Sequence, residues 1–215
     1  MLLFLGVLLL SGCAMFETQG EKTARDLAEE GMEAFKDEDY KASIEAFEKL
    51  KDWYPFSPYA ILAELKLGDA YYFRKEYEDA IDAYESFENL HPKNEAIPYV
   101  VYQIGRCYYD RIQSVDRDQT ITAQALQTFE RLVRSYPDSP YAKKAQSAIR
   151  VCKKNLAEHE FYIGAFYFKT GHLKAARERF KRVVSLYPDL GVHYNALQYL
   201  ARCRRKMQHL GAKAE

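Results

Sequence analysis

The chain has 215 residues, 48% of them hydrophobic and 29% charged, which is enough apolar material for a core, and its ten glycines and seven prolines exclude a low-complexity chain. The net charge is zero, yet residues 1–98 carry 21 acidic and 10 basic side chains, and residues 99–215 carry 10 and 21. This asymmetry predicts two faces with different partners; the alternative is that charged helical surfaces divide this way without a role.

The first twelve residues, MLLFLGVLLLSG, form an apolar run that is too short to span a bilayer as a helix and has the length of an export-signal core. The run leads into Leu10-Ser11-Gly12-Cys13, which resembles the lipobox of bacterial lipoproteins. The resemblance implies cleavage before Cys13 and acylation of that residue, which anchors a chain stably when several acyl chains are attached. Ala14, where an Asp would imply retention in the inner membrane, implies the outer membrane.

One feature departs from a typical export signal, because no Lys or Arg precedes the apolar run. The alternative is the first helix of a cytosolic protein, but Leu2–Leu10 lacks the polar face of an amphipathic helix. Residues 13–21 are then a lipidated tether of at most about 3.5 Å per residue, which holds the next element near the membrane surface.

Four sets of small, aromatic and proline residues recur in register along the rest of the chain. The sets are Gly31, Ser43, Phe47, Pro55; Gly68, Ala80, Tyr84, Pro92; Gly105, Ala125, Phe129, Pro137; and Gly164, Ala176, Phe180, Pro188. Small residues let two antiparallel helices approach, an aromatic fills the gap, and proline ends the second helix, which is the tetratricopeptide pattern. The third set is eight residues longer, and the excess lies in the polar stretch Asp110–Thr120.

The predicted fold is therefore all-α, a tetratricopeptide superhelical solenoid of four helix pairs plus a C-terminal capping helix. The solenoid occupies residues 22–209, with repeats at about 22–55, 56–92, 93–137 and 140–188, a final helix at 191–209 and a tail at 210–215. Ser57-Pro58 and Ser139-Pro140 predict helix starts, because a capping hydroxyl precedes a proline at the first helical position. The long distance from Pro137 to Gly164 predicts one helix of roughly 30 residues over 140–170.

The sequence contains no arrangement typical of catalysis, of a metal or of a cofactor. His159-Glu160 begins like a zinc motif, but Ile163 stands where the second histidine belongs. Cys107, Cys152 and Cys203 have no metal-ligand spacing, so we expect small buried residues on helices, with a disulfide as the alternative. We expect no catalytic residue and, for an exported chain, no nucleic-acid partner.

The first helices of tetratricopeptide pairs line a concave groove, and the glycine phase predicts which side chains face it. The predicted groove residues are Phe35, Asp69, Tyr72, Phe73, Tyr99, Tyr102, Arg106 and Tyr109. Aromatics dominate this set, with Asp69 and Arg106 as isolated charges, which suits an extended segment with aromatic or aliphatic side chains. The alternative is that these rings only pack between repeats. The same phase adds Phe161, Phe168 and Lys169 in the fourth repeat.

With the lipobox and repeats in place, three stretches and the long helix through Glu160-Phe161-Tyr162 carry a family resemblance. The stretches are WYPFSPYA at 53–60, LVRSYPDSPY at 132–141 and residues 171–188. The chain resembles the BamD family, tetratricopeptide lipoproteins of the outer-membrane β-barrel assembly machinery. The resemblance implies a scaffold on the periplasmic face of the outer membrane that holds the POTRA part of a BamA-like insertase, receives unfolded β-barrel proteins, and meets other assembly lipoproteins.

Within that resemblance, the basic C-terminal half is expected to dock an acidic surface of the insertase through Arg202, Arg205 and Lys206. An alternative is a tetratricopeptide lipoprotein of another envelope machine, either a secretin pilotin or a coordinator of peptidoglycan synthesis. A module associated with a peptidoglycan enzyme is the third possibility. Co-purified partners would separate the three.

Overall fold

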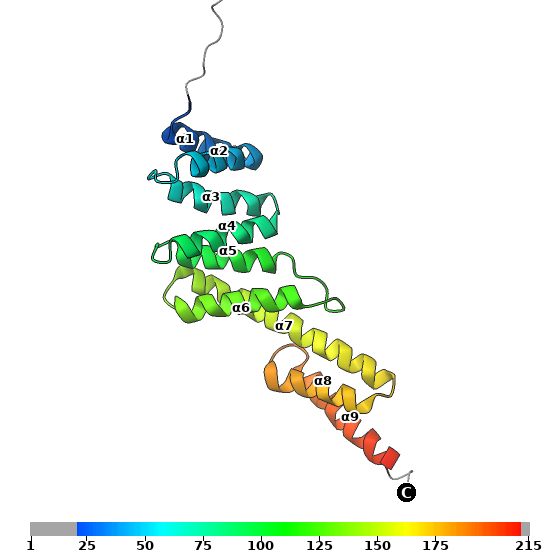
Figure 1. Ribbon diagram of the computed structural model, residues 1–215. Helices are drawn as coiled ribbons and strands as arrows, with labels where there is room; N and C mark the ends of the chain where they lie inside the picture. Colours follow the sequence, from blue (N-terminus) through cyan, green and yellow to red (C-terminus); the bar gives the residue numbers. More distant parts are fainter. Residues whose placement is uncertain (1–20, 212–215) are drawn as a thin grey trace, which may run out of the picture. The chain divides into compact units, whose positions relative to one another are not determined.

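The computed structural model describes residues 21–211, and within this range it contains α-helices and no strands (Figure 1). The helices are α1 (Ala24–Lys36), α2 (Tyr40–Trp53), α3 (Ala60–Phe73), α4 (Tyr77–Leu90), α5 (Ile97–Tyr109), α6 (Thr120–Ser135), α7 (Pro140–Lys169), α8 (Leu173–Leu186) and α9 (His193–Gly211). The predicted all-α class is confirmed. The predicted signal peptide, Cys13 and most of the tether lie outside the described residues, as do the last four residues of the predicted tail.

The described chain forms two compact units that meet within α3, one ending at Ala63 and the other beginning at Glu64. In the first unit, α1 packs against α2 around the buried side chains of Leu27, Phe47 and Leu50. A capping box starts α1, because the Thr23 hydroxyl accepts a hydrogen bond from the Asp26 N–H while the Asp26 carboxylate accepts one from the Thr23 N–H.

In the second unit, each helix from α4 to α9 packs against the next one along the chain. One apolar cluster joins α4, α5, α6 and the first half of α7, and it includes Phe87, Ile104 and Leu132. A second cluster joins the C-terminal half of α7 with α8 and α9 around Phe180.

The repeating glycines allow the close approach of paired helices. A Cβ atom added to Gly68, Gly105 or Gly164 would lie 2.5, 2.4 or 2.8 Å from a ring carbon of Tyr84, Phe129 or Phe180. Gly31 faces Phe47 at the same 2.5 Å in the first unit, where the Ser43 hydroxyl also donates to the Gly31 carbonyl at 2.9 Å. The spacing that predicted the repeats is thus a steric requirement of each helix pair.

The turn inside three of the helix pairs uses a residue with left-handed backbone geometry, seven positions after the glycine. These residues are Glu38, Lys75 and Gly171, with φ of 61°, 64° and 84°. In the fourth repeat the His172 N–H bonds the Tyr167 carbonyl at 2.9 Å, and in the second repeat the equivalent Glu76 N–H bonds the Tyr71 carbonyl at 3.0 Å. This is a Schellman-type ending, for which glycine is the unstrained choice.

Helix boundaries match the sequence closely, with two small differences. The 30-residue α7 is capped by the Ser139 side chain with Pro140 in its first turn, as predicted. The α3 helix begins at Ala60 rather than Pro58, because Ser57 forms a local turn in which its hydroxyl accepts from the Tyr59 N–H. The α9 helix extends to Gly211, two residues into the predicted tail.

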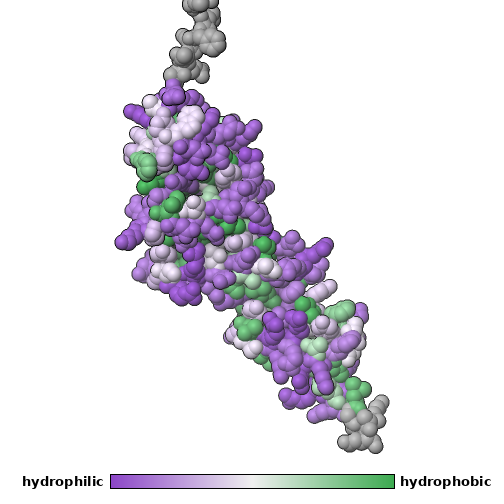
Figure 2. Space-filling model, viewed as in Figure 1, coloured by the Kyte–Doolittle hydropathy of each residue, from purple (hydrophilic) through white to green (hydrophobic). Residues whose placement is uncertain are grey.

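No helix in the described range is both long enough and apolar enough to cross a membrane. The face drawn in Figure 2 is mainly hydrophilic, with hydrophobic residues gathered in small patches.

Candidate binding surfaces

Asp69 lies inside the second unit, not on a groove surface. Its side chain is buried, with the residue 2% exposed. The carboxylate accepts hydrogen bonds from the hydroxyls of Tyr84 and Tyr99 at 2.7 and 2.6 Å and pairs with Lys66 at 2.8 Å. The expectation that Asp69 is an isolated groove charge is wrong, because the hydroxyl of the fully buried Tyr84 needs an acceptor in the interior.

Burial raises the pKa of Tyr84 well above its usual value, and the neighbouring Asp69 carboxylate raises it further. The pKa of Tyr99 is raised by the same two causes in the same order. Both tyrosines therefore stay protonated and keep donating to Asp69 throughout the physiological pH range. The amide of Gln103 extends the cluster, lying 3.3 Å from the Tyr99 hydroxyl.

Arg106 is also paired, so the second expected isolated charge is corrected too. Its guanidinium bonds both oxygens of Asp110, one turn later on the chain, at 2.8 and 3.1 Å, and its Cζ lies 5.6 Å from the centre of the Tyr109 ring. The Tyr72 hydroxyl donates to the same Asp110 carboxylate. Burial, and then this hydrogen bond, raise the pKa of Tyr72 above its usual value.

The other predicted groove aromatics differ in what they expose. Phe73 is 50% exposed, and its ring meets that of Tyr72 edge-on, with centroids 5.6 Å apart. Tyr102 is half-buried against Phe129, and Tyr109 packs on the same ring. The second unit thus offers half-buried ring edges, and the hydroxyls of Tyr72, Tyr84 and Tyr99 are already hydrogen-bonded to carboxylates.

Phe35 belongs to the first unit. It is half-buried on α1, where its ring packs edge-on against Tyr40 at a centroid distance of 5.4 Å.

In the fourth repeat, α9 covers the aromatics that the glycine phase assigned to the groove. The ring of Tyr199 lies 5.5 Å from Phe161 and 5.1 Å from Phe168. Arg202 lies above the rings of Tyr199 and Phe168 at 4.8 and 5.3 Å, and Lys206 lies 4.6 Å from the centre of Phe168. Two of the three predicted docking cations are thus held in place by aromatic faces.

The third predicted docking cation, Arg205, is exposed on the same helix. Within residues 21–211, none of Arg202, Arg205 and Lys206 forms an ion pair with a carboxylate, so their charge is available to a partner. The structure brings these three together on one face of α9, within little more than one turn.

A second buried carboxylate, Glu160 on α7, was missed by sequence reasoning. It is bonded by Arg179 at 3.0 Å and Arg182 at 3.1 Å, both on α8. The sequence did contain a signal for this burial. Position 160 lies four residues before a repeat glycine, and the residues at the same position in the first and third repeats, Leu27 and Val101, are buried. A carboxylate at a core phase predicts a cationic partner.

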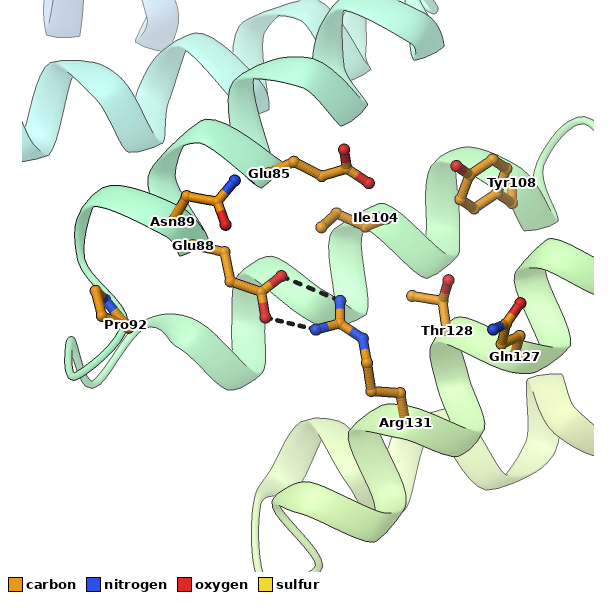
Figure 3. Close-up of a pocket in the computed structure, with 9 residues that line it drawn as sticks. All are labelled: Glu85, Glu88, Asn89, Pro92, Ile104, Tyr108, Gln127, Thr128 and Arg131. Carbon is orange, nitrogen blue, oxygen red and sulfur yellow. Dashed lines mark hydrogen bonds and ion pairs between the residues drawn. The ribbon is translucent and has the colours of Figure 1, made fainter.

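The outer side of α4, α5 and α6 forms a shallow pocket of about 620 Å³ (Figure 3). Arg131 from α6 reaches across it and binds both carboxylate oxygens of Glu88 on α4, at 2.5 and 3.1 Å. Tyr108 of α5 lines the same hollow, and burial followed by the charge of Glu85 raises its pKa. The bidentate pair between Arg131 and Glu88 joins α6 to α4, which are separated along the chain by α5. We therefore assign the pocket a structural role.

The polar stretch between α5 and α6 is anchored rather than loose. The Nδ1 atom of His159 on α7 lies 2.6 Å from the carbonyl oxygen of Val115. The Gln119 amide donates to the carbonyls of Ser114 and Arg117. His159 is therefore occupied in fixing this connection, and the described residues contain no cluster of side chains able to hold a metal ion.

Cys107, Cys152 and Cys203 are buried free thiols, which confirms the expectation of small core residues. Burial raises the pKa of the Cys107 and Cys152 thiols to about 12 and also raises that of Cys203. These thiols are consequently poor nucleophiles at neutral pH.

The chain matches the family model YfiO, described as an outer membrane lipoprotein, over residues 20–215. The outer membrane protein assembly factor BamD of Rickettsia prowazekii is 31% identical over 210 residues, covering 97% of this chain and 82% of that protein. The chain belongs to the BamD family. The BamD of Caulobacter vibrioides is also 31% identical, over 67% of this chain, and the chain spans 48% of the length of that protein.

The fold of this BamD-family chain also resembles solved tetratricopeptide structures. The TPR2AB domain of yeast Sti1, solved in a complex with pHSP90, aligns with a TM-score of 0.53 and 16% identity, covering 86% of this chain and 70% of that one. At such low identity the likeness shows the fold alone, and it agrees with the helix pairs described above.

Proposed function

We propose that the chain is a lipid-anchored scaffold of outer-membrane β-barrel assembly, acting at the periplasmic face by binding rather than by catalysis. It holds the POTRA part of a BamA-like insertase and receives unfolded outer-membrane β-barrel proteins. The observation that carries this proposal is membership in the BamD family over residues 20–215. The anchor is Cys13, for which the lipobox is the support.

The substrate surface of the second unit consists of the ring edges of Tyr72, Phe73, Tyr102 and Tyr109. Phe35 is proposed separately, as a substrate contact on the first unit. Because the Tyr72 hydroxyl is already bonded to Asp110, apolar and edge contacts dominate recognition. Such a surface suits an extended strand with an aromatic end. Arg106 holds the Tyr72 ring in place through Asp110, whereas the Tyr99 hydroxyl is engaged by the buried Asp69.

Photo-crosslinking amino acids at Phe73 and Tyr102 test the substrate surface. In cells, both positions are expected to capture unfolded barrel precursors. Val151, which is also exposed but lies on α7 outside this set, is the control position. Capture that is equal at Val151, or absent at both test positions, would contradict the proposed surface.

The insertase surface consists of Arg202, Arg205 and Lys206 on α9, whose unpaired charge suits an acidic patch. Reversing Arg202 and Arg205 to glutamate is expected to abolish co-purification with the insertase. The matched control is Lys143→Glu, an exposed cation at the start of α7. If the α9 variant retains its partner, or if Lys143→Glu loses it equally, the docking proposal is wrong.

A further inference from the structure

The turn between α2 and α3, in the first unit, exposes two large aromatic side chains. Phe56 is 100% exposed and Trp53 is 56% exposed. The backbone around them is nevertheless ordered, because Tyr54 N–H bonds the Leu50 carbonyl at 2.9 Å and Ser57 N–H bonds the Tyr54 carbonyl at 3.0 Å. The turn therefore holds both rings out into solvent on a hydrogen-bonded frame.

The corresponding turns of the other repeats do not share this feature. Each contains the proline that aligns with Pro55, but a charged residue replaces Phe56: Lys93, Asp138 and Asp189. The position of Trp53 is taken by Leu90, Ser135 and Leu186. Since three helix pairs end without the two aromatics, the fold does not require them, and their exposure in the first repeat needs another explanation.

This turn is tied to the segment that leads back to the proposed anchor. The Tyr54 hydroxyl donates a hydrogen bond to the carbonyl of Lys22 at 2.8 Å. Lys22 is nine positions after Cys13, so a fully extended chain separates them by at most about 30 Å. An acylated Cys13 would therefore keep Trp53 and Phe56 within reach of the membrane surface.

We propose that Trp53 and Phe56 insert into the interfacial layer of the membrane that holds Cys13, so that the first unit rests on the bilayer at this turn. The proposal depends on the lipid anchor of the proposed function. The indole ring of tryptophan is apolar with one N–H donor, a combination that favours the boundary between headgroups and acyl chains. Phenylalanine next to it adds apolar area to the contact.

The charge of the first unit makes this contact apolar rather than electrostatic. Residues 21–63 carry 11 acidic and 6 basic side chains, so anionic lipids do not attract this unit as a whole. The insertion is consequently expected to be at least as strong on zwitterionic as on anionic vesicles, and added salt should not weaken it. A protein segment that bound the same two rings would show no dependence on lipid at all.

Trp53 is the only tryptophan in the chain, so its fluorescence reports the contact directly. Residues 13–215 are coupled through the Cys13 thiol to phosphatidylcholine vesicles that carry maleimide headgroups. The other three thiols are buried with raised pKa values, so Cys13 reacts first. The expected result is a blue shift of Trp53 emission on coupling, with quenching by lipids brominated close to the headgroup.

Two variants make the test specific. Phe56→Ser keeps the probe and removes one ring, and the equilibrium constant for insertion is expected to fall about tenfold. Leu90→Ser removes a side chain with 62% exposure from the equivalent turn of the second repeat and is expected to change nothing. Emission that is identical on and off the vesicles overturns the proposal, as does a blue shift that appears only when an unfolded barrel protein is added.

The anchor is tested separately, by the mass of the mature chain purified from cells. Unacylated Cys13 would remove the lipid anchor of the proposed function, whereas the coupled chain would still report whether Trp53 meets lipid. Crosslinking of barrel precursors at Phe73 is likewise independent of the Trp53 result.

Discussion

The second and fourth repeats solve the same packing problem with different chemistry, in both cases with residues of the second unit. In each, a glycine of the first helix faces an aromatic ring of the second, Gly68 with Tyr84 and Gly164 with Phe180. Tyrosine brings a hydroxyl into the core, and Asp69 supplies its acceptor. Phenylalanine needs none. A repeat that uses tyrosine at this position therefore requires a buried hydrogen-bond acceptor, here the carboxylate of Asp69, while one that uses phenylalanine does not.

The fourth repeat still buries a carboxylate, but for a different purpose. Glu160 is held by Arg179 and Arg182, which join α7 to α8 through charge. The side chains of both arginines are partly exposed, so they can return to water when their partner is removed. The Tyr84 hydroxyl has no such escape, because the residue is fully buried. The two carboxylates should thus differ in what their loss costs.

The largest effect is expected for Asp69→Ala, which should lower the free energy of unfolding by about 3 kcal/mol because buried hydroxyl donors lose their acceptor. Urea denaturation of the full chain measures this change. In the double variant with Tyr84→Phe, the orphaned hydroxyl is gone, so the combined cost should be less than the sum of the single costs. Additive costs would show that Asp69 does not serve Tyr84.

A smaller effect is expected for Glu160→Gln, about 1–2 kcal/mol in the free energy of unfolding, because the two arginines regain hydration. The same denaturation experiment applies, and raising the salt concentration should reduce the difference between variant and parent. A loss as large as that of Asp69→Ala would contradict the distinction between buried hydroxyl donors and half-exposed cations.

The contrast between these repeats also shows what the sequence can and cannot predict. The glycine-to-aromatic spacing predicted every helix pair because it records a local steric contact between neighbouring helices. The place of Asp69 was not predictable from that phase alone, since its partner Tyr99 is 30 residues away and comes from the next repeat. Glu160 could have been identified as a buried carboxylate, because its position is a core position in the first and third repeats. The long helix α7 followed directly from the distance between Pro137 and Gly164.

The groove assignment was wrong for Asp69, Arg106 and Phe168, for a related physical reason. Counting from the glycine gives the direction of a side chain, but it does not give what the neighbouring repeat presents to it. Arg106 was therefore predicted to be an isolated charge, although Asp110, one helical turn onward, neutralises it. Phe168 was predicted to line the groove, although α9 covers it. Exposure depends on the next element, which the pattern of a single repeat does not contain.

The third prediction distinguishes Tyr84 of the second repeat from Phe180 of the fourth by the dependence of stability on pH. The folded-state pKa of Tyr84 is raised above its unfolded value near 10, so its contribution to stability is complete below about pH 10 and is lost as the pH rises towards the folded value. The expected slope from this one group is about 1.4 kcal/mol per pH unit. Tyr99, whose folded-state pKa is also raised by burial and then by Asp69, adds a slope of the same sign.

Urea denaturation at a series of alkaline pH values measures that slope. Tyr84→Phe should reduce the slope, because phenylalanine, which the fourth repeat has as Phe180, does not titrate. The pKa values of Cys107 and Cys152 are also raised, so the contribution of these thiols to the stability of the fold is likewise lost as the pH rises, from about pH 9 upward. The measurement is therefore made in a background with both cysteines changed to alanine. An unchanged slope in Tyr84→Phe would show that this hydroxyl is not what resists alkali.

The smallest effect concerns the turns of the two repeats, where Lys75 and Gly171 occupy the same left-handed position. A side chain in this conformation is strained, so Lys75→Gly is expected to raise the free energy of unfolding by about 0.5–1 kcal/mol. Gly171→Ala should lower it by about 1 kcal/mol. A Cβ at Gly171 would meet no atom within 4 Å, so that loss reports backbone strain alone. Thermal unfolding of both variants, followed by circular dichroism, should move in opposite directions; if Lys75→Gly destabilises the chain, then the lysine stabilises its turn by more than the strain costs.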